Sequence, residues 1–352
     1  MADALSLPTR AAAPAQSASE IAVIVATCDR PEQLEACLRS LAAQTHRPAV
    51  IVVVDDAPGG EVTPAVVARL ATGFPIRYVE GRRGGLGDAH NRGLEHVDTP
   101  LVAFTDDDVI AEARWLERVV AAFDADERVG CVTGMIEPLE LRSDVQLMLE
   151  GYAGFNKGEA RRVYDLDAHR PDEPLFPFAA GQLGSGANMS FRRSVLEEMG
   201  GFDPALGAGT RARSGDDLLA FFEVIQNGHR LVYEPEAVVR HRHADTMQAF
   251  ERQVYGYGVG LTAYLTRCLL GRPRLLPTVL RRLPRAIAYV LDPCSLKNAR
   301  LPPDYPPAFR RRERLGMVVG PFAYLASRRE VRRRHARAAH ATGPRRARGR
   351  PA

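Results

Sequence analysis

The sequence predicts an α/β fold, in which helices flank a mainly parallel sheet and a basic, helical extension follows at the C-terminus. Three observations lead to this prediction. Short, wholly apolar segments alternate with amphipathic segments over residues 20–125, polar and acidic residues directly follow the apolar segments, and positive charge gathers at the end of the chain. Strands that are apolar throughout are typical of parallel sheets, because helices cover both of their faces.

The alternation continues element by element along this region. Apolar segments predict strands over 21–26, 50–54, 76–79 and 101–105. Apolar residues at helical spacing predict a helix that begins at Pro31 and further helices over 62–70, 86–97 and 113–123. Such a sheet has right-handed crossovers and binds its ligands at the carboxyl ends of its strands.

The chain has 352 residues, enough for one large domain or two modest ones. We expect a disordered leader over 1–19, because this segment is rich in Ala, Ser and Pro. A main domain over 20–243 would follow, with halves over 20–110 and 111–243. A helical region over 244–330 and a disordered basic tail over 331–352 would complete the chain.

The net charge of +4 conceals an uneven distribution. Residues 244–352 contain 23 Lys and Arg against 6 Asp and Glu, a balance of +17, which leaves −13 for the rest of the chain. This asymmetry indicates an anionic partner for the extension, such as an anionic membrane surface. A solvated tail explains the arginines equally well, and nucleic acid is disfavoured because the tail has few aromatic residues and no known reader motif.

The cysteines and the hydropathy suggest a cytoplasmic protein. Five cysteines are scattered without a CxxC pair, which favours reduced thiols. No apolar run reaches the roughly 18 residues that span a bilayer. The stretch over 275–291 is amphipathic and studded with arginine, with breaks expected at Pro277 and Pro284. It could place the protein at the inner face of a membrane or pack against its own domain.

Three adjacent carboxylates, Asp106, Asp107 and Asp108, follow the apolar segment that ends at Thr105. Neighbouring carboxylates repel one another and need a compensating cation. Mg²⁺ or Mn²⁺ supplies that charge through one or two carboxylates and the phosphate oxygens of a substrate. The alternative is a helix N-cap, although a cap needs only one acid.

A second acidic pair, Asp216 and Asp217, follows Gly215 and opens an apolar helical segment. A carboxylate at this position could act as a general base that removes a proton from an attacking sugar hydroxyl. It could also serve only as a helix N-cap. The two acidic clusters lie far apart in the sequence, so only the fold can bring them together.

Eight motifs follow one another in a fixed order between about residues 20 and 245. They are 21–30 (IAVIVATCDR), 52–57 (VVVDDA), 84–93 (GGLGDAHNRG), 104–108 (FTDDD), 184–192 (GSGANMSFR), 200–203 (GGFD), 215–218 (GDDL) and 231–241 (LVYEPEAVVRH). This ordered set resembles the family 2 glycosyltransferases of the Rossmann-like GT-A fold, with 20–110 as the nucleotide-sugar half and 111–243 as the acceptor half.

The resemblance implies a set of donor-binding residues. Thr27 and Asp29 would line the nucleotide pocket, and Asp56 or Asp55 would accept a hydrogen bond from the base, unless Asp55 only forms a turn. Asn91 and Arg92 would hold the diphosphate, or Arg92 would lie on a helix surface. The triplet Asp106, Asp107 and Asp108 would contact the donor and its metal ion.

The resemblance also implies the catalytic residues. Asp106 and Asp108 would bind Mn²⁺ or Mg²⁺, with His241 or His243 completing the metal site unless both histidines are surface residues. Asp217 would be the general base of an inverting transfer, with Asp216 in place of the family's Glu beside it. Leu219 stands where many members carry another Asp, a departure that affects the acceptor site.

The predicted activity is therefore transfer of a sugar from a nucleoside diphosphate sugar to an acceptor hydroxyl. The acceptor could be lipid-linked, a polysaccharide, a peptide or a small molecule. A nucleotidyltransferase on a similar sheet is one alternative, but it would need a Gly-rich loop with Lys after the first strand, where Thr27, Cys28, Asp29 and Arg30 stand. A non-catalytic protein that binds nucleic acid or membranes through its arginines is the other.

Overall fold

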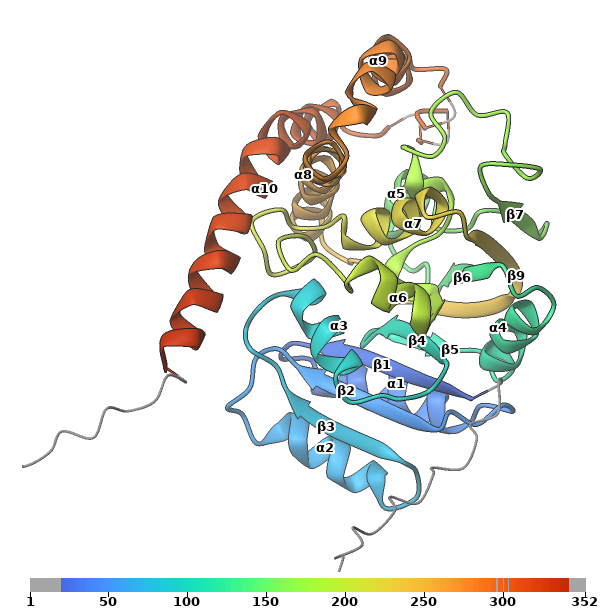
Figure 1. The fold of residues 1–352 in the computed structure, drawn as a ribbon, viewed down its shortest axis with the longest axis vertical. Coiled ribbons are helices and arrows are strands. Elements are labelled where there is room, and N and C mark those ends of the chain that lie inside the picture. The colour runs from blue at the N-terminus through green and yellow to red at the C-terminus, as the bar shows by residue number, and fades with distance from the viewer. Residues whose placement is uncertain (1–19, 296, 300, 303, 342–352) are drawn as a thin grey trace, which may run out of the picture.

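The computed structural model describes residues 20–341 apart from 296, 300 and 303. Its centre is a nine-stranded sheet with the order β3-β2-β1-β4-β8-β6-β9-β5, and β7 also pairs with β9. Figure 1 shows helices on both sides of this sheet and the C-terminal helices at one end of the molecule. The strands are β1 Ile21–Thr27, β2 Val50–Asp55, β3 Ile76–Glu80, β4 Leu101–Asp106, β5 Val109–Ala111, β6 Val129–Pro138, β7 Arg162–Tyr164, β8 Met189–Arg192 and β9 Arg230–His241.

The predicted α/β fold is confirmed. Strands β1 to β4 are parallel to one another, whereas β8 lies antiparallel between β4 and β6. The helices are α1 Pro31–Ala42, α2 Val62–Ala71, α3 Leu86–Leu94, α4 Trp115–Asp124, α5 Asp144–Ala153, α6 Arg193–Met199, α7 Asp216–Gln226, α8 Met247–Gly271, α9 Leu276–Leu291 and α10 Pro307–Ala341, with short 3₁₀ turns at Ala180–Gln182, Gly186–Asn188 and Pro273–Leu275.

The sheet separates two hydrophobic cores. In β1, Ala22 and Ile24 face one core, and Ile21, Val23 and Val25 face the other. All five side chains are fully buried. The strand is apolar throughout because successive side chains point to opposite faces and both faces are covered.

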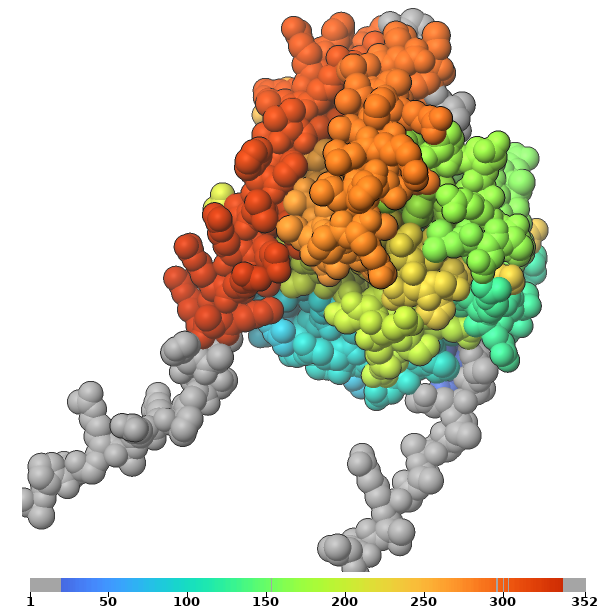
Figure 2. Space-filling view, turned by 45° about the horizontal axis from the view of Figure 1, so that its top comes forward, coloured from blue at the N-terminus to red at the C-terminus, as the bar shows by residue number. Residues whose placement is uncertain are grey.

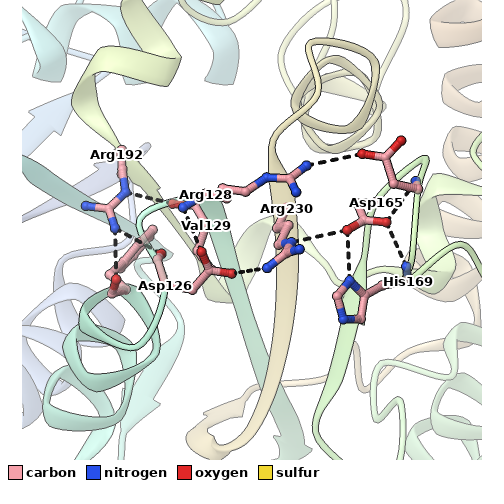
Figure 3. Close-up of polar contacts among 9 residues, drawn as sticks. Asp126, Arg128, Val129, Asp165, His169, Arg192 and Arg230 are labelled. Atoms are coloured by element: carbon pink, nitrogen blue, oxygen red, sulfur yellow. Dashed lines mark hydrogen bonds and ion pairs between the residues drawn. The ribbon is translucent and has the colours of Figure 1, made fainter.

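A polar network holds the N-terminal ends of β6 and β9 in place (Figure 3). Arg230 donates to the carboxylates of Asp126 and Asp165, and it thereby links β9 to the turn before β6 and to the loop after β7. Arg192, at the end of β8, donates from Nε to the carbonyl of Val129 at 2.8 Å. These contacts tie β6, β8 and β9 to one another and to the loops that flank them.

The C-terminal region packs through glycines. Helices α8 and α10 run side by side in the same direction: a Cβ at Gly258 would lie 2.1 Å from the carbonyl oxygen of Glu313, and one at Gly320 would lie 2.3 Å from that of Val259. The absence of side chains at these positions lets the two backbones approach closely.

Two expectations for this region are wrong. Residues 331–341, expected to be a disordered tail, continue α10, because Arg and Ala are strong helix formers; residues 342–352 lie outside the described part of the chain, as does the expected leader over 1–19. The expected breaks in 275–291 do not occur, since Pro277 occupies the first turn of α9 and Pro284 lies inside the helix. Among the described residues, we find no helix long and apolar enough to cross a membrane.

Candidate active site

Three strands bring two carboxylates and an imidazole together. Strand β4 ends at Asp106, Asp108 lies in the turn before β5, and β5 pairs with the end of β9 so that Val109 stands opposite His241. Ligand atoms of Asp106, Asp108 and His241 all lie within 4.8 Å of one another. Nε2 of His241 lies 3.3 Å from Oδ1 of Asp108.

This cluster has the composition of a divalent-metal site. Oδ1 of Asp108 and Nδ1 of His241 are buried and have no hydrogen-bond partner. Buried polar atoms are normally satisfied, so unpartnered atoms indicate a missing ligand. Two carboxylate oxygens and an imidazole nitrogen suit Mn²⁺ or Mg²⁺. The residues present therefore fit a metal ion of this kind.

The protonation of the cluster follows from burial and close charge. Burial and the neighbouring charge of Asp108 raise the pKa of Asp106 to about 7. Burial alone would raise the pKa of Asp108, but its close contact with His241 and the charge of Arg30 outweigh burial and lower that pKa. Burial would lower the pKa of His241, yet the contact with Asp108 raises it. The protonation of each of the three groups therefore depends on the other two. A bound cation would favour ionised carboxylates and a neutral imidazole, and so would displace protons from the cluster.

Arg30 is a site residue to which the sequence analysis gave no role. Its guanidinium NH1 lies 2.8 Å from Oδ2 of Asp108 and 3.2 Å from Oδ1 of Asp107. Thr27 donates to Oδ2 of Asp107 at 2.7 Å. Strands β1 and β4 are neighbours, with Ala26 opposite Asp106, so an Arg just past the end of β1 lies near the acids at the end of β4. The adjacency of these two strand ends could have predicted the contact.

The acids after β2 are occupied by protein donors. Asp55 is buried and accepts hydrogen bonds from the amide of Ala57 at 3.0 Å and the hydroxyl of Tyr78 at 3.0 Å. Asp56 accepts the amides of Gly84 at 3.0 Å and Gly85 at 2.9 Å. Burial raises the pKa of Asp56 despite these two bonds. Asp56 thus anchors the loop before α3, and its remaining lone pairs are available to a ligand.

Asp29, Asn91 and Arg92 differ in their surroundings. Asp29 is exposed just past β1 and has a φ of 54°. The side-chain amide of Asn91 binds the backbone of Phe202 twice: Nδ2 donates to the carbonyl at 2.8 Å, and Oδ1 accepts from the amide N–H at 2.8 Å. Arg92 pairs with Glu95 on the surface of α3. Asn91 is thus engaged by the backbone, whereas Nε of Arg92 is buried without a hydrogen-bond partner, and the role of both residues toward a diphosphate stays a prediction.

The second acidic pair opens α7. Gly215 precedes it with a φ of 95°, and a Cβ there would lie 2.7 Å from the carbonyl oxygen of Gly260 in α8. Asp217 accepts the amides of Gly186 at 3.0 Å and of Leu218 at 2.8 Å. Burial raises the pKa of Asp217 against these hydrogen bonds.

Asp216 lies in a different environment. It is buried, and burial together with Asp217 raises its pKa to about 8. Oδ2 of Asp216 lies 3.8 Å from Nδ1 of His90, and neither atom has a hydrogen-bond partner. Burial lowers the pKa of His90 to about 3, so that ring is neutral.

The two acidic clusters converge. Thr105, next to Asp106, donates to the carbonyl of Ala187 at 2.8 Å. The amide of the adjacent Gly186 donates to Asp217 at 3.0 Å. Burial first, and then the charges of the carboxylates in both clusters, raise the pKa of Tyr257 in α8. The fold has thus joined sequence segments from β4 and α7 at one edge of the sheet.

His243 lies outside the metal cluster. Its Nε2 lies 2.7 Å from Oε2 of Glu150 in α5, and the side chain is buried. Of the two histidines expected to complete the metal site, His241 is the one that the structure brings to Asp106 and Asp108. The end of the strand explains the difference: His241 is the last residue of β9 and pairs with β5, whereas His243 lies beyond the strand and is not held by that pairing.

Glycosyltransferases are among the known proteins whose sequences are similar to this chain. A Pre-mycofactocin glycosyltransferase of Mycobacterium tuberculosis is 30% identical over 174 residues, which cover 49% of this chain and 33% of that protein. This chain therefore spans only about a third of that relative's length. A Glucosyl-dolichyl phosphate glucuronosyltransferase of Haloferax volcanii is 24% identical over 260 residues, covering 67% of this chain and 73% of that protein.

A solved structure shows a similar fold. The mannosyltransferase PcManGT of Pyrobaculum calidifontis, in complex with GDP-Man and Mn²⁺, superposes with a TM-score of 0.51 at 20% identity, covering 92% of this chain and 76% of that one. The model of the glycosyltransferase like family 2 matches residues 18–255, well over half of the chain. The chain therefore belongs to glycosyltransferase family 2, and its fold is the GT-A fold.

Proposed function

We propose that this chain is a metal-dependent, inverting glycosyltransferase that moves a sugar from a nucleoside diphosphate sugar to an acceptor hydroxyl. The observation that supports this most directly is the cluster of Asp106, Asp108 and His241. The turn over 186–188 connects this cluster to Asp217, because Gly186 donates to Asp217 and Ala187 accepts from Thr105. The GDP-Man and Mn²⁺ bound to PcManGT support a donor and a divalent ion of the same kind here.

In this proposal, Asp106, Asp108 and His241 hold the metal ion. A bound divalent ion neutralises negative charge on the diphosphate as it leaves. Arg30 fixes the carboxylates of Asp107 and Asp108 through its two contacts. Thr27, Asp29 and Asp56 border the nucleotide pocket at the carboxyl ends of β1 and β2.

Asp217 acts as the general base. Its raised pKa makes it a stronger proton acceptor than an exposed carboxylate. It takes the proton of the acceptor hydroxyl as that oxygen bonds to the anomeric carbon. The bond to the diphosphate breaks on the opposite side, its electron pair leaves with the nucleoside diphosphate, and the configuration inverts.

The proposal also includes the cellular compartment and the class of acceptor. All five cysteines are free thiols, which agrees with a reducing, cytoplasmic compartment. The acceptor remains a hydroxyl compound that is lipid-linked, a polysaccharide, a peptide or a small molecule.

A thermal-shift screen tests the donor and metal parts of the proposal. The full chain is heated with each common nucleoside diphosphate, with and without Mn²⁺ or Mg²⁺. A ligand that binds only the folded state raises the melting temperature. We expect at least one diphosphate to do so only when the metal is present, and Asp108→Ala to abolish that dependence. A shift that is the same after chelation, or no shift with any diphosphate, contradicts metal-dependent donor binding.

A further inference from the structure

Helix α9 exposes a continuous apolar stripe. Its members are spaced by three or four residues and so lie on one face of the helix. Each is between 44% and 56% exposed, and α9 has no buried residue at all. In Figure 2, α9 lies on the molecular surface that faces the viewer. The stripe consists of Leu276, Leu280, Leu283, Ile287 and Leu291.

The opposite face of α9 attaches it to the protein through few contacts. Arg282 donates to the carbonyl of Phe176, and its guanidinium lies 5.4 Å from the ring centroid of Phe178. The hydroxyl of Tyr289 accepts a hydrogen bond from Gln182 at 3.4 Å. These contacts fix which side of the helix faces the protein, and they leave the apolar stripe on the solvent-exposed side.

The charged side chains within α9 are all basic, and one acid, Asp292, lies next to the helix at its C-terminal end. The helix contains no acidic residue, and Arg281 and Arg285 are exposed. Burial and the nearby guanidiniums of Arg170, Arg281 and Arg285 lower the pKa of Arg282. Within the described part of the chain, no carboxylate forms an ion pair with any of these four arginines. A partner of this surface therefore has to combine an apolar phase with negative charge.

We propose that α9 lies in the interface of a membrane that contains anionic lipids, with the leucine stripe among the acyl chains and the arginines at the headgroups. A second copy of the chain is a poorer partner, because pairing two α9 helices would bring their arginines together without a compensating acid. The proposal concerns the location of the protein and holds whichever sugar it transfers.

Sedimentation of the full chain with phosphatidylcholine vesicles, with and without phosphatidylglycerol, tests the proposal at low and high salt. We expect binding only to the vesicles with phosphatidylglycerol, and weaker binding at high salt, because screening reduces the attraction. The double variant Leu280→Glu/Ile287→Glu should bind at least about tenfold more weakly, because it places charge in the apolar stripe. Arg281→Glu/Arg285→Glu should weaken binding and reduce its salt dependence.

The matched control is Val62→Glu/Arg47→Glu, which changes an exposed apolar and an exposed basic residue in the other half of the molecule. This control should bind like the wild type. The melting temperature and its shift with nucleoside diphosphate should be unchanged in all variants, which separates loss of membrane binding from misfolding or loss of the donor site. The proposal is overturned if the wild type ignores phosphatidylglycerol, or if the α9 variants bind as the control does. Dimerisation that Leu280→Glu/Ile287→Glu abolishes, without vesicle binding, would assign the stripe to a second copy instead.

Discussion

The carboxylates of Asp216 and Asp217 are neighbours in sequence but are expected to differ in protonation. The carboxylate of Asp217 is held by two backbone amides, whereas Asp216 has a buried, unpartnered oxygen beside the neutral ring of His90. Hydrogen bonds from amides favour the charged form, and burial without partners favours the neutral form. Replacing each residue by Asn can therefore show which of them acts as a base, as proposed for Asp217, and which stays protonated, as expected for Asp216.

Replacing Asp217 by Asn should abolish sugar transfer and leave donor binding intact. The amide oxygen of Asn keeps an acceptor for the loop around Gly186, but the side chain can no longer take up a proton. A loss of general base catalysis lowers the rate by about 10²- to 10⁴-fold. Initial rates measure the loss, and the thermal shift with nucleoside diphosphate and metal measures donor binding. Wild-type turnover by this variant would exclude Asp217 from the role of base.

Asp216→Asn should make stability less dependent on pH. An unfolded Asp has a pKa near 3.9, and burial raises that of folded Asp216 to about 8. Between these values the folded state holds a proton that the unfolded state has released, so this residue's contribution to stability falls as pH rises from about 4 to about 8. Asn carries no such proton. The melting temperature of the variant relative to wild type should therefore increase across this window and then level off. A constant difference would show that Asp216 is ionised in the folded state.

Residue types and order predicted much of the candidate site, but not its contacts. Asp106, Asp108 and Asp217 stood out because adjacent acids at strand and helix ends are costly without a purpose. Arg30 and His90 did not, since an Arg after a strand and a His on a helix are common in sequences with no site. The hydrogen bonds of Asn91 to Phe202 were not predictable either, because the two residues are 111 positions apart in the sequence and no local pattern links them.

At the scale of elements, strands with both faces buried were predictable from the sequence, whereas a short antiparallel strand placed among them was not. The apolar runs of β1, β2 and β4 are typical of strands in a covered parallel sheet. Strand β8 covers only Met189–Arg192, and its antiparallel position between β4 and β6 depends on tertiary pairing. Proline misled the interpretation of α9: Pro277 lies in the first turn, where a helix needs no N–H donor, and Pro284 removes one backbone hydrogen bond without ending the helix.

Gly320→Ala should destabilise the packing of α10 on α8. A Cβ at this position would lie 2.0 Å from Oγ1 of Thr262 and 2.3 Å from the carbonyl oxygen of Val259, so the helices have to separate. Overpacking of this kind costs about 1–3 kcal/mol. Gly73→Ala is the matched control, because nothing lies within 4 Å of its added Cβ. Thermal or denaturant unfolding measures both, and equal stability of the two variants would contradict the close approach of the helices.

At the scale of the whole molecule, α10 connects regions that are far apart in the sequence. Its first half packs on α8, and its last turns reach the nucleotide half of the sheet, as Figure 1 shows. Glu330 pairs with Arg211 in the loop before α7. Arg334 donates to the carbonyls of Arg83 at 3.1 Å and Gly84 at 3.2 Å. The segment expected to be a solvated tail is thus attached to the loop that Asp56 anchors.

Replacing Arg334 by Ala should therefore weaken donor binding, although this residue lies in the C-terminal extension. Its guanidinium and the carboxylate of Asp56 hold the same loop from two sides, through Gly84. Without the charge-assisted hydrogen bonds, the loop has to be ordered by the ligand, at a cost of about 1 kcal/mol or a roughly fivefold loss of affinity. Arg333→Ala, which removes an equal charge from an exposed position, should bind donor normally. Titration of nucleoside diphosphate in the presence of Mn²⁺ compares the two variants. Equal affinities would mean that α10 lies against the nucleotide half without supporting it.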